Sequence, residues 1–266
     1  MIKKISVEYF FTYSIDLVVS NFFFIDKKNI QRNNFRLNRD ESHHLINVMR
    51  LRVNSKIWLT DGDGTSYLGF IDSFDNRIVS GQILESYKNK NELEHYIHLG
   101  LPIIKNSRIK IAVEKSVECG VKEITPLSLD RSVKSNLSIK RLNSICQSAG
   151  KQSMRSVFPK LNPVSSLPDW YNSDAINIVC LIESDKNLSD FKNEIFKANN
   201  KKKKIFILVG PEGDFSDEEK EFIYDKKFLK VNLGNTILRT ETAIISILSV
   251  LNELMVQRNQ DRIDAI

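Results

Sequence analysis

The sequence predicts an α/β protein in which a small β-rich domain precedes a larger domain built around a mainly parallel sheet. From about Phe22 to Glu94, short apolar runs such as KIWLT and SYLGFI are separated by two Asp-Gly turn signals, which is typical of a small barrel or sandwich. After the polar segment KNKNELE, strand-like and helix-like runs alternate towards the C-terminus. Such alternation favours parallel strands joined by helices.

The length and composition fit two domains. A chain of 266 residues that is 41% hydrophobic can bury one large core or two modest ones. We therefore expect an N-terminal extension over residues 1–21, a β-rich domain over residues 22–95 and an α/β domain over residues 96–266.

One helix is expected inside the β-rich domain, around DESHHLINVMRL. Leu45, Val48 and Met49 recur there at helical spacing. Asp40 or Ser42 is expected to cap the start of this helix, because short polar side chains satisfy the free amides of a first turn.

Two positions call for backbone conformations that most residues avoid. Asn54, in VNSKI, stands where a turn residue that tolerates positive φ is wanted. Gly120 is expected to end the helix formed by RIKIAVEKSVECG, after which VKEITPL forms a strand. The lysine run 201–204 is interpreted as a solvated loop.

The chain carries 39 basic and 33 acidic residues, which gives a net charge of +6. This excess suits a polyanionic partner such as RNA. A lysine-rich solvated surface explains the charge almost as well, so charge alone does not identify the ligand.

The cysteines and histidines indicate neither a disulfide framework nor a metal site. No CxxC motif occurs, and no histidine has a cysteine or paired carboxylates at ligand spacing. The residues concerned are Cys119, Cys146, Cys180, His43, His44, His95 and His98. We expect structural roles for them and a reducing, cytoplasmic environment.

The N-terminus resembles a signal peptide only superficially. Its apolar stretch is interrupted by Glu8, Asp16 and Asn21, and no small-residue cleavage pattern follows. Its longest uncharged stretch is far shorter than the roughly 20 residues that span a bilayer. We expect no membrane association.

The strongest local signal is KKKKIFILVGPEGDFSDEEKEFI, in which an apolar strand enters a Gly-Pro-Glu-Gly loop and then a helix. Ser216 and Glu219 form a capping box at the start of the helix. Glycine-rich turns of this kind usually hold phosphate, but neither GxGxxG nor Gly-Lys-Ser/Thr is present. An ordinary capped turn is the competing interpretation.

Acidic side chains crowd this loop: Glu212, Asp214, Asp217, Glu218 and Glu219. Their charge would repel a pyrophosphate that the helix dipole would otherwise attract. The ligand should therefore be neutral or positively charged, and S-adenosylmethionine, with its sulfonium and ammonium groups, is such a ligand.

A second strand, glycine loop and helix follow in FLKVNLGNTILRTETAIISILSVLNEL. If the two loops lie at the carboxyl ends of neighbouring strands, they form one crevice. Arg239, Thr240, Glu241 and Thr242 precede or begin the helix and are candidate site residues, although capping explains Thr240 and Thr242 equally well.

The last helix is expected from about Glu241 to Met255 and is apolar on most faces. We expect burial on more than one side, against the core and against a second subunit. The apolar residues are Ala243, Ile244, Ile247, Leu248, Leu251 and Leu254.

The two loops, LVGPEGDFSDEE and LGNTILRTETA, resemble the C-terminal signatures of the RsmE family of ribosomal RNA methyltransferases. KNSRIKIAVEKSVECGVKEITPL and AGKQSMRSVFP resemble two further family segments, in the same order, over about residues 97–258. The β-rich domain matches more loosely, chiefly through HHLINVMRLRVNSKI. Departures from the family pattern stand at Asp214, Lys151, Cys119 and Asn54.

The resemblance implies a PUA-like RNA-binding domain followed by an α/β trefoil-knot domain of the SPOUT class. It also implies a homodimer that transfers methyl from S-adenosylmethionine to N3 of a uridine in 16S rRNA of the small ribosomal subunit. Its expected cofactor wall is Val209, Gly210, Pro211, Glu212, Gly213, Leu233, Gly234, Ile237, Leu238, Arg239 and Thr240.

The roles of individual residues in the reaction and in RNA binding are hypotheses that also rest on this resemblance. Arg239 is expected to stabilise charge on a uracil carbonyl oxygen, and Glu241 or Glu212 to accept the N3 proton. The residues expected to contact RNA are Lys105, Arg108, Arg131, Gln152 and Arg155. No metal ligand is expected.

Two other functions compete with this interpretation. A non-catalytic RNA-binding or ribosome-assembly protein would have lost cofactor binding, and a methyltransferase for a different RNA nucleotide would keep it. A nucleotide-hydrolysing enzyme is disfavoured by the missing phosphate lysine and the acidic loop.

Overall fold

A computed structural model of the protein describes residues 22–133 and 137–263, and the predictions for residues 1–21 lie outside these ranges. The described chain forms two compact units, one of residues 22–91 with 151–157 and one of residues 92–150 with 158–263. The sequence had placed the boundary after residue 95 and all later residues in one domain. Segment 151–157 instead belongs with the β-rich unit.

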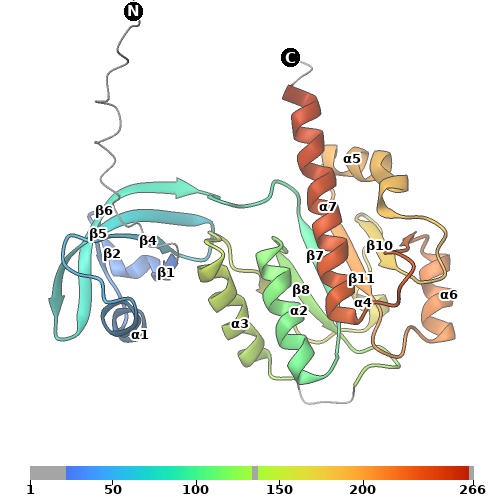
Figure 1. The fold of residues 1–266 in the computed structure, drawn as a ribbon, viewed down its shortest axis with the longest axis horizontal. Helices are drawn as coiled ribbons and strands as arrows, with labels where there is room; N and C mark the ends of the chain where they lie inside the picture. Colours follow the sequence, from blue (N-terminus) through green and yellow to red (C-terminus); the bar gives the residue numbers. More distant parts are fainter. Residues whose placement is uncertain (1–21, 134–136, 264–266) are drawn as a thin grey trace, which may run out of the picture. The chain divides into compact units, whose positions relative to one another are not determined.

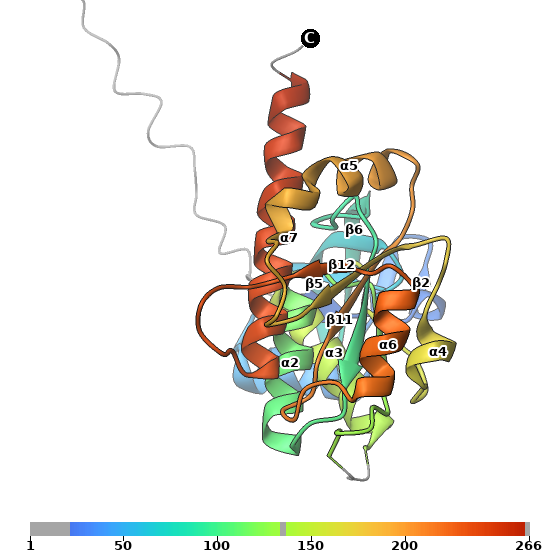
Figure 2. The same cartoon turned by 90° about the vertical axis from the view of Figure 1, so that its right-hand side faces the viewer.

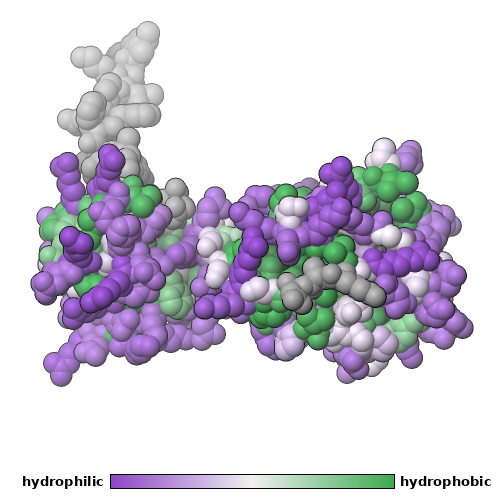
Figure 3. Space-filling model, turned by 90° about the horizontal axis from the view of Figure 1, so that it is seen from below, coloured by the Kyte–Doolittle hydropathy of each residue, from purple (hydrophilic) through white to green (hydrophobic). Residues whose placement is uncertain are grey.

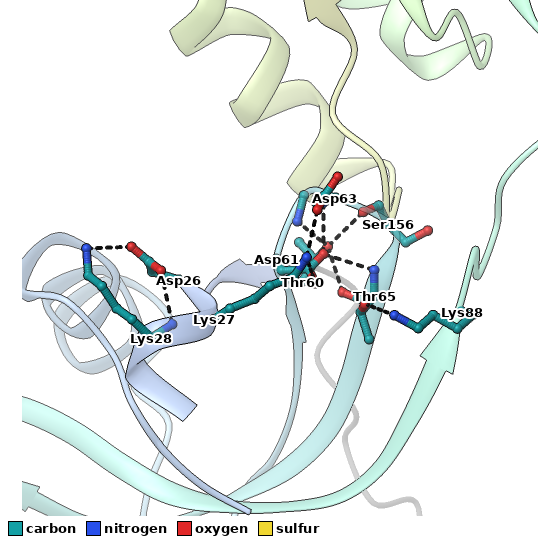
Figure 4. Close-up of polar contacts among 10 residues, drawn as sticks. Asp26, Lys27, Lys28, Thr60, Asp61, Asp63, Thr65, Lys88 and Ser156 are labelled. Atoms are coloured by element: carbon teal, nitrogen blue, oxygen red, sulfur yellow. Dashed lines mark hydrogen bonds and ion pairs between the residues drawn. The ribbon is translucent and has the colours of Figure 1, made fainter. Parts of the chain in front are cut away.

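Hydrogen bonds explain why segment 151–157 joins the β-rich unit. The Ser156 carbonyl accepts from the Gly64 amide at 2.9 Å and from the Thr60 hydroxyl at 3.2 Å. Figure 4 shows Ser156 beside Thr60. Lys151 pairs with Glu41 at 2.5 Å, so both ends of the segment are attached to the unit.

The first unit is a six-stranded sheet in which β1 is parallel to β4 and the other pairs are antiparallel. In sheet order the strands are β1 (Phe22–Phe24), β4 (Lys56–Thr60), β5 (Thr65–Asp75), β6 (Ile78–Lys88), β3 (Asn34–Arg36) and β2 (Ile30–Gln31). The predicted runs KIWLT and SYLGFI are therefore strands β4 and part of β5. The turn at Asn54 has the expected positive φ, 68°.

The expected helix in this unit is shorter and differently capped. It consists of α1 (Arg39–His43) followed by a π-helical turn, η3 (His44–Val48). Asn38 caps it by accepting from the Glu41 amide at 2.8 Å, so the prediction of Asp40 or Ser42 was wrong. A π-turn shifts the helical spacing, and Val48 is 59% exposed where the sequence predicted a buried apolar face.

The second unit is a sheet of six parallel strands covered by helices on both faces (Figure 1). In sheet order the strands are β12 (Leu229–Val231), β10 (Ile176–Cys180), β11 (Ile205–Val209), β7 (Ile97–Pro102), β8 (Glu123–Leu127) and β9 (Lys160–Leu161). Strands such as β11, IFILV, are buried at every residue because both faces are covered.

The helices of this unit divide between the two faces of the sheet (Figure 2). One core lies against α2 (Asn106–Glu118), α3 (Ile139–Gln152), α5 (Lys192–Asn200) and α7 (Thr240–Ile263). The other lies against α4 (Leu167–Trp170) and α6 (Asp217–Asp225). A short 3-10 turn, η4 (Leu188–Phe191), leads into α5. The result is a three-layer α/β/α arrangement.

Three predictions for this unit are confirmed. Gly120 ends the α2 segment with a φ of 87°, and the Ser216–Glu219 capping box starts α6. The apolar residues predicted on α7 are buried, among them Ile244 and Leu251 at 0% exposure. Within the described residues, no helix is long and apolar enough to cross a membrane.

The strand order corrects one expectation. The two glycine loops were expected on neighbouring strands, but β10 lies between β11 and β12. A third loop, the one that follows β10, is therefore brought to the same edge of the sheet.

Burial of α7 gives a direct test of the core that lies against α2, α3, α5 and α7. Leu248 is fully buried and Val250 on the same helix is 41% exposed. We expect Leu248→Ala to lower the free energy of unfolding by roughly 2–5 kcal/mol, since it leaves a cavity. Val250→Ala, the control, should change it by less than about 0.5 kcal/mol. Urea titration would measure both, and equal midpoints would contradict the assigned core.

Candidate functional site

Three loops at the carboxyl ends of β10, β11 and β12 surround a pocket of about 290 Å³. They contribute Leu181 and Ile182 after β10, residues 210–212 and 214 after β11, and residues 232–234 and 236–239 after β12. Figure 2 shows the last of these loops curving beside α7 before the helix begins. Ligands of open parallel sheets bind at this edge.

The predicted cofactor residues come together here, with one exception. All of them line the pocket except Gly213. A Cβ atom at Gly213 would point towards the side chain of Arg131. The sequence missed Arg108, Cys180, Leu181, Ile182, Asp214, Val231, Asn232, Thr236 and Ala243 as lining residues. Leu181 and Ile182, which follow β10, belong to no glycine loop or motif. Only the strand order shows that they line the pocket.

Asn232 locks the loop after β12 to the loop after β10. Its side-chain amide donates to the carbonyls of Ile182 at 2.7 Å and Ser184 at 3.1 Å, and its backbone amide donates to the Lys186 carbonyl at 2.7 Å. Its side-chain oxygen accepts from the Gly234 amide at 2.7 Å. Gly234 has a φ of 131°, which side chains rarely allow, and nothing lies within 4 Å of where its Cβ would be.

Thr240 joins the start of α7 to the loop after β11. Its hydroxyl donates to the Gly210 carbonyl at 2.9 Å, and the residue is only 4% exposed. The sequence left open whether Thr240 and Thr242 were caps or site residues. Thr240 lies in the pocket wall, whereas Thr242 is exposed and outside it.

The two carboxylates considered as bases share one cation. The Arg108 guanidinium lies 2.5 Å from a Glu212 oxygen and 3.8 Å from a Glu241 oxygen. Glu241 is 9% exposed, and its Oε2 is buried without a hydrogen-bond partner. Glu212 lies at the pocket wall with a side chain that is 30% exposed. Arg108, expected to contact RNA, is thus part of the pocket.

The other residues expected to contact RNA are spread over both units. The Arg131 guanidinium donates to the Gly213 carbonyl at 3.0 Å and supports the loop from outside. Lys105 and Gln152 are exposed. Arg155 is only 3% exposed, so its guanidinium does not face solvent as the sequence suggested.

The pocket fits a cofactor with an apolar body. Leu181, Val209 and Leu238 form an apolar part of the wall, and the carboxylates of Glu212 and Asp214, which also line the pocket, are paired with Arg108 and Lys220. Burial raises the pKa of the Cys180 thiol to about 12, so this pocket residue is not a thiolate at neutral pH. In the described ranges, no group of His, Cys, Asp or Glu side chains suits a metal ion.

Known proteins match both units. An RNA methyltransferase domain matches residues 91–252, and an RNA methyltransferase PUA domain matches residues 37–83. The chain is 32% identical over 240 residues to ribosomal RNA small subunit methyltransferase E of Mesomycoplasma hyopneumoniae, covering 85% of this chain and 96% of that protein. The Bacillus subtilis protein of the same name is 29% identical, covering 82% and 89%.

Solved structures agree with the sequence comparisons. Ribosomal RNA small subunit methyltransferase E of Neisseria gonorrhoeae, bound to S-adenosyl methionine, superposes with a TM-score of 0.77 at 27% identity, covering 88% of this chain and 97% of that one. A probable rRNA-methyltransferase of Porphyromonas gingivalis gives 0.76 at 25% identity, covering 90% and 99%.

The parallel sheet with its three-loop pocket, preceded by a PUA-like domain, defines an RNA methyltransferase of the knotted SPOUT class. Within that class, the chain belongs to the ribosomal RNA small subunit methyltransferase E family. The fold class implied by the sequence motifs is confirmed.

Thr240 gives a test of the pocket wall that needs no ligand. Thr240→Val leaves the Gly210 carbonyl without its donor, and we expect a loss of about 1–3 kcal/mol in the free energy of unfolding. Thr242→Val removes an exposed hydroxyl and should change stability by less than about 0.5 kcal/mol. Urea unfolding measures both variants, and an unaltered midpoint for Thr240→Val would show that the bond is unimportant.

Proposed function

We propose that this protein transfers a methyl group from S-adenosylmethionine to N3 of a uridine in 16S rRNA of the small ribosomal subunit. The observation that carries the proposal is the pocket, which gathers the glycine loop after β11 and the loop after β12 into one wall. The gonorrhoeal relative bound to S-adenosyl methionine supports the cofactor, and the relatives' names support the RNA.

The chemistry of N3 sets what the residues must do. S-adenosylmethionine, when bound, supplies an electrophilic methyl group on its sulfonium. The protein must hold an unpaired uracil with N3 in line with that group, because N3 lies on the Watson–Crick edge. It must also accept the imide proton and stabilise the charge that develops on the base.

Arg239 suits stabilisation of the developing charge. It lies in the pocket wall and is exposed, so its guanidinium is accessible to a base that enters from solvent. A fixed cation beside a uracil carbonyl oxygen stabilises the deprotonated base in the transition state.

Glu212 suits the role of base better than Glu241. Glu212 lines the pocket, whereas Glu241 is nearly buried behind Arg108 and is not part of the lining. Glu241 therefore positions the Arg108 guanidinium, and Arg108 in turn orients the Glu212 carboxylate at 2.5 Å.

The partners follow from the same proposal. The protein acts as a cytoplasmic homodimer on the small subunit. Ile111 on α2 is 44% exposed. Figure 3 shows apolar side chains gathered on one face of the second unit. Exposed apolar area of this kind favours a partner subunit.

Replacing Arg239 tests the proposed function directly. Arg239→Ala should lower methyl transfer by about 100-fold or more, because the developing charge loses its cation, while S-adenosylhomocysteine still binds. The assay transfers labelled methyl to small subunits that lack the modification, and primer extension maps the stop. Asn235→Ala, in the same loop but outside the pocket lining, is the control.

The outcomes of that assay separate the competing functions. A stop at one 16S uridine supports the proposal, and transfer elsewhere indicates a different RNA nucleotide. Failure of the wild-type protein to bind the cofactor supports the non-catalytic RNA-binding function. Unchanged transfer by Arg239→Ala would remove Arg239 from the mechanism.

The role of Glu212 as a base predicts a distinct pH dependence of the reaction rate. Glu212→Gln should lower kcat by about 100-fold at neutral pH, the usual contribution of a general base. Because uracil N3 ionises unaided as pH rises, part of that loss should be recovered in alkaline buffer. Glu241→Gln should act more weakly and without this recovery. A pH profile of single-turnover rates distinguishes them, and an equal deficit at every pH would exclude Glu212 as the base.

A further inference from the structure

Lys220, on α6, joins two of the three pocket loops through a pair of ion pairs. Its ammonium lies 2.8 Å from an Asp214 carboxylate oxygen and 3.1 Å from a Glu183 carboxylate oxygen. Asp214 belongs to the loop after β11 and lines the pocket, and Glu183 belongs to the loop after β10. One side chain outside the pocket therefore connects both.

Asp214 has a backbone conformation that makes this contact informative. Its φ is 61°, in the left-handed region where glycine is free and other residues are disfavoured. Its amide donates to the Pro211 carbonyl at 3.0 Å, which fixes the tight turn. The cost of a side chain at such a position has to be offset by favourable contacts, and the ion pair with Lys220 is one such contact of Asp214.

The charges around Lys220 agree with this arrangement. Hydrogen bonds to Asp214 first, and to Glu183 second, raise the pKa of Lys220 above its usual value. The Lys220 side chain is 27% exposed and its partners are 40% and 41% exposed, so each pair alone is weak. One cation shared between two anions loses side-chain entropy only once for both contacts.

Lys220 completes a set of connections among all three loops. Asn232 joins the loop after β12 to the loop after β10, and Thr240 joins the start of α7 to the loop after β11. Lys220 joins the loop after β11 to the loop after β10. Each of the three loops is therefore connected to the other parts of the pocket wall by a polar contact.

We propose that Lys220, with Asp214 and Glu183, is a positioning device that holds the loops after β10 and β11 at the separation required for S-adenosylmethionine to bind. The inference rests on the proposed function. Without the bridge, the loops sample arrangements that do not bind, and apparent affinity falls in proportion to the binding-competent fraction. The chemical step is unaffected, because Lys220 is not part of the pocket lining.

The test measures affinity for S-adenosylhomocysteine by calorimetry and steady-state constants for S-adenosylmethionine. Lys220→Met, which keeps the length of the side chain, should raise Kd and the cofactor KM about five-fold with kcat unchanged, equivalent to roughly 1 kcal/mol. Lys220→Arg should restore most of the affinity. Glu218→Gln, in the same first turn of α6 and without a described ion pair, is the charge control and should bind as the wild type does.

Asp214→Gly is a second variant for the same affinity measurement. Glycine adopts a φ of 61° freely, so this variant keeps the turn and removes only the carboxylate. Its effect should match that of Lys220→Met, and the double variant should be no weaker than either single variant, as expected for residues that act as one unit.

The opposite sign would overturn the inference. If the Asp214 carboxylate acted only by attracting the positively charged cofactor, Lys220→Met would free that charge and tighten binding. Tighter or unchanged binding by Lys220→Met therefore refutes the positioning role. Failure of the wild-type protein to bind S-adenosylhomocysteine refutes the proposed function itself, and the two failures are thus distinguishable.

Discussion

The insertion of β10 between β11 and β12 is the constraint on which the site depends. All six strands of the second unit are parallel, so their carboxyl ends share one edge. Two loops on adjacent strands would form an open crevice, and a third strand between them adds a wall. Leu181 and Ile182 enter the pocket for this reason alone. The strand order is set by the parallel pairing of β10 with β11 on one side and with β12 on the other.

The loops of this pocket are connected by polar contacts between segments distant in the sequence. Arg108 comes from α2, about a hundred residues before Glu212, and Arg131 reaches the Gly213 carbonyl from a similar distance. Loops alone are the least stable parts of a fold. Anchoring them to α2, α6 and α7 makes the geometry of the pocket a property of the whole second unit.

Local signals in the sequence predicted the parts of the site that are local. The capping box at Ser216, the end of α2 at Gly120 and the turn at Asn54 each follow from the chemistry of one residue or one short motif. The position of β10, the pairing of Arg108 and the attachment of segment 151–157 depend on contacts between distant segments. Periodicity carries no information about these. Even a local rule failed at the start of α1, where the cap is Asn38, two residues before Asp40 and four before Ser42.

Ion pairs compensate much of the negative charge on the loop after β11. The acidic loop was expected to repel phosphate because its carboxylates stood together without visible compensation. In the structure, Arg108 compensates Glu212 and Lys220 compensates Asp214. Glu219 is occupied as the capping acceptor of the Ser216 amide.

The carboxylates that remain, at Asp217 and Glu218, lie in the first turn of α6, where the helix dipole favours them. Little uncompensated charge is then left to repel an anion over a distance. Selectivity against phosphate must instead come from the apolar wall of Leu181, Val209 and Leu238, which offers a dianion no replacement for its hydration. A cofactor with an apolar body loses less hydration in the same wall, so its affinity depends on how closely the three loops approach one another.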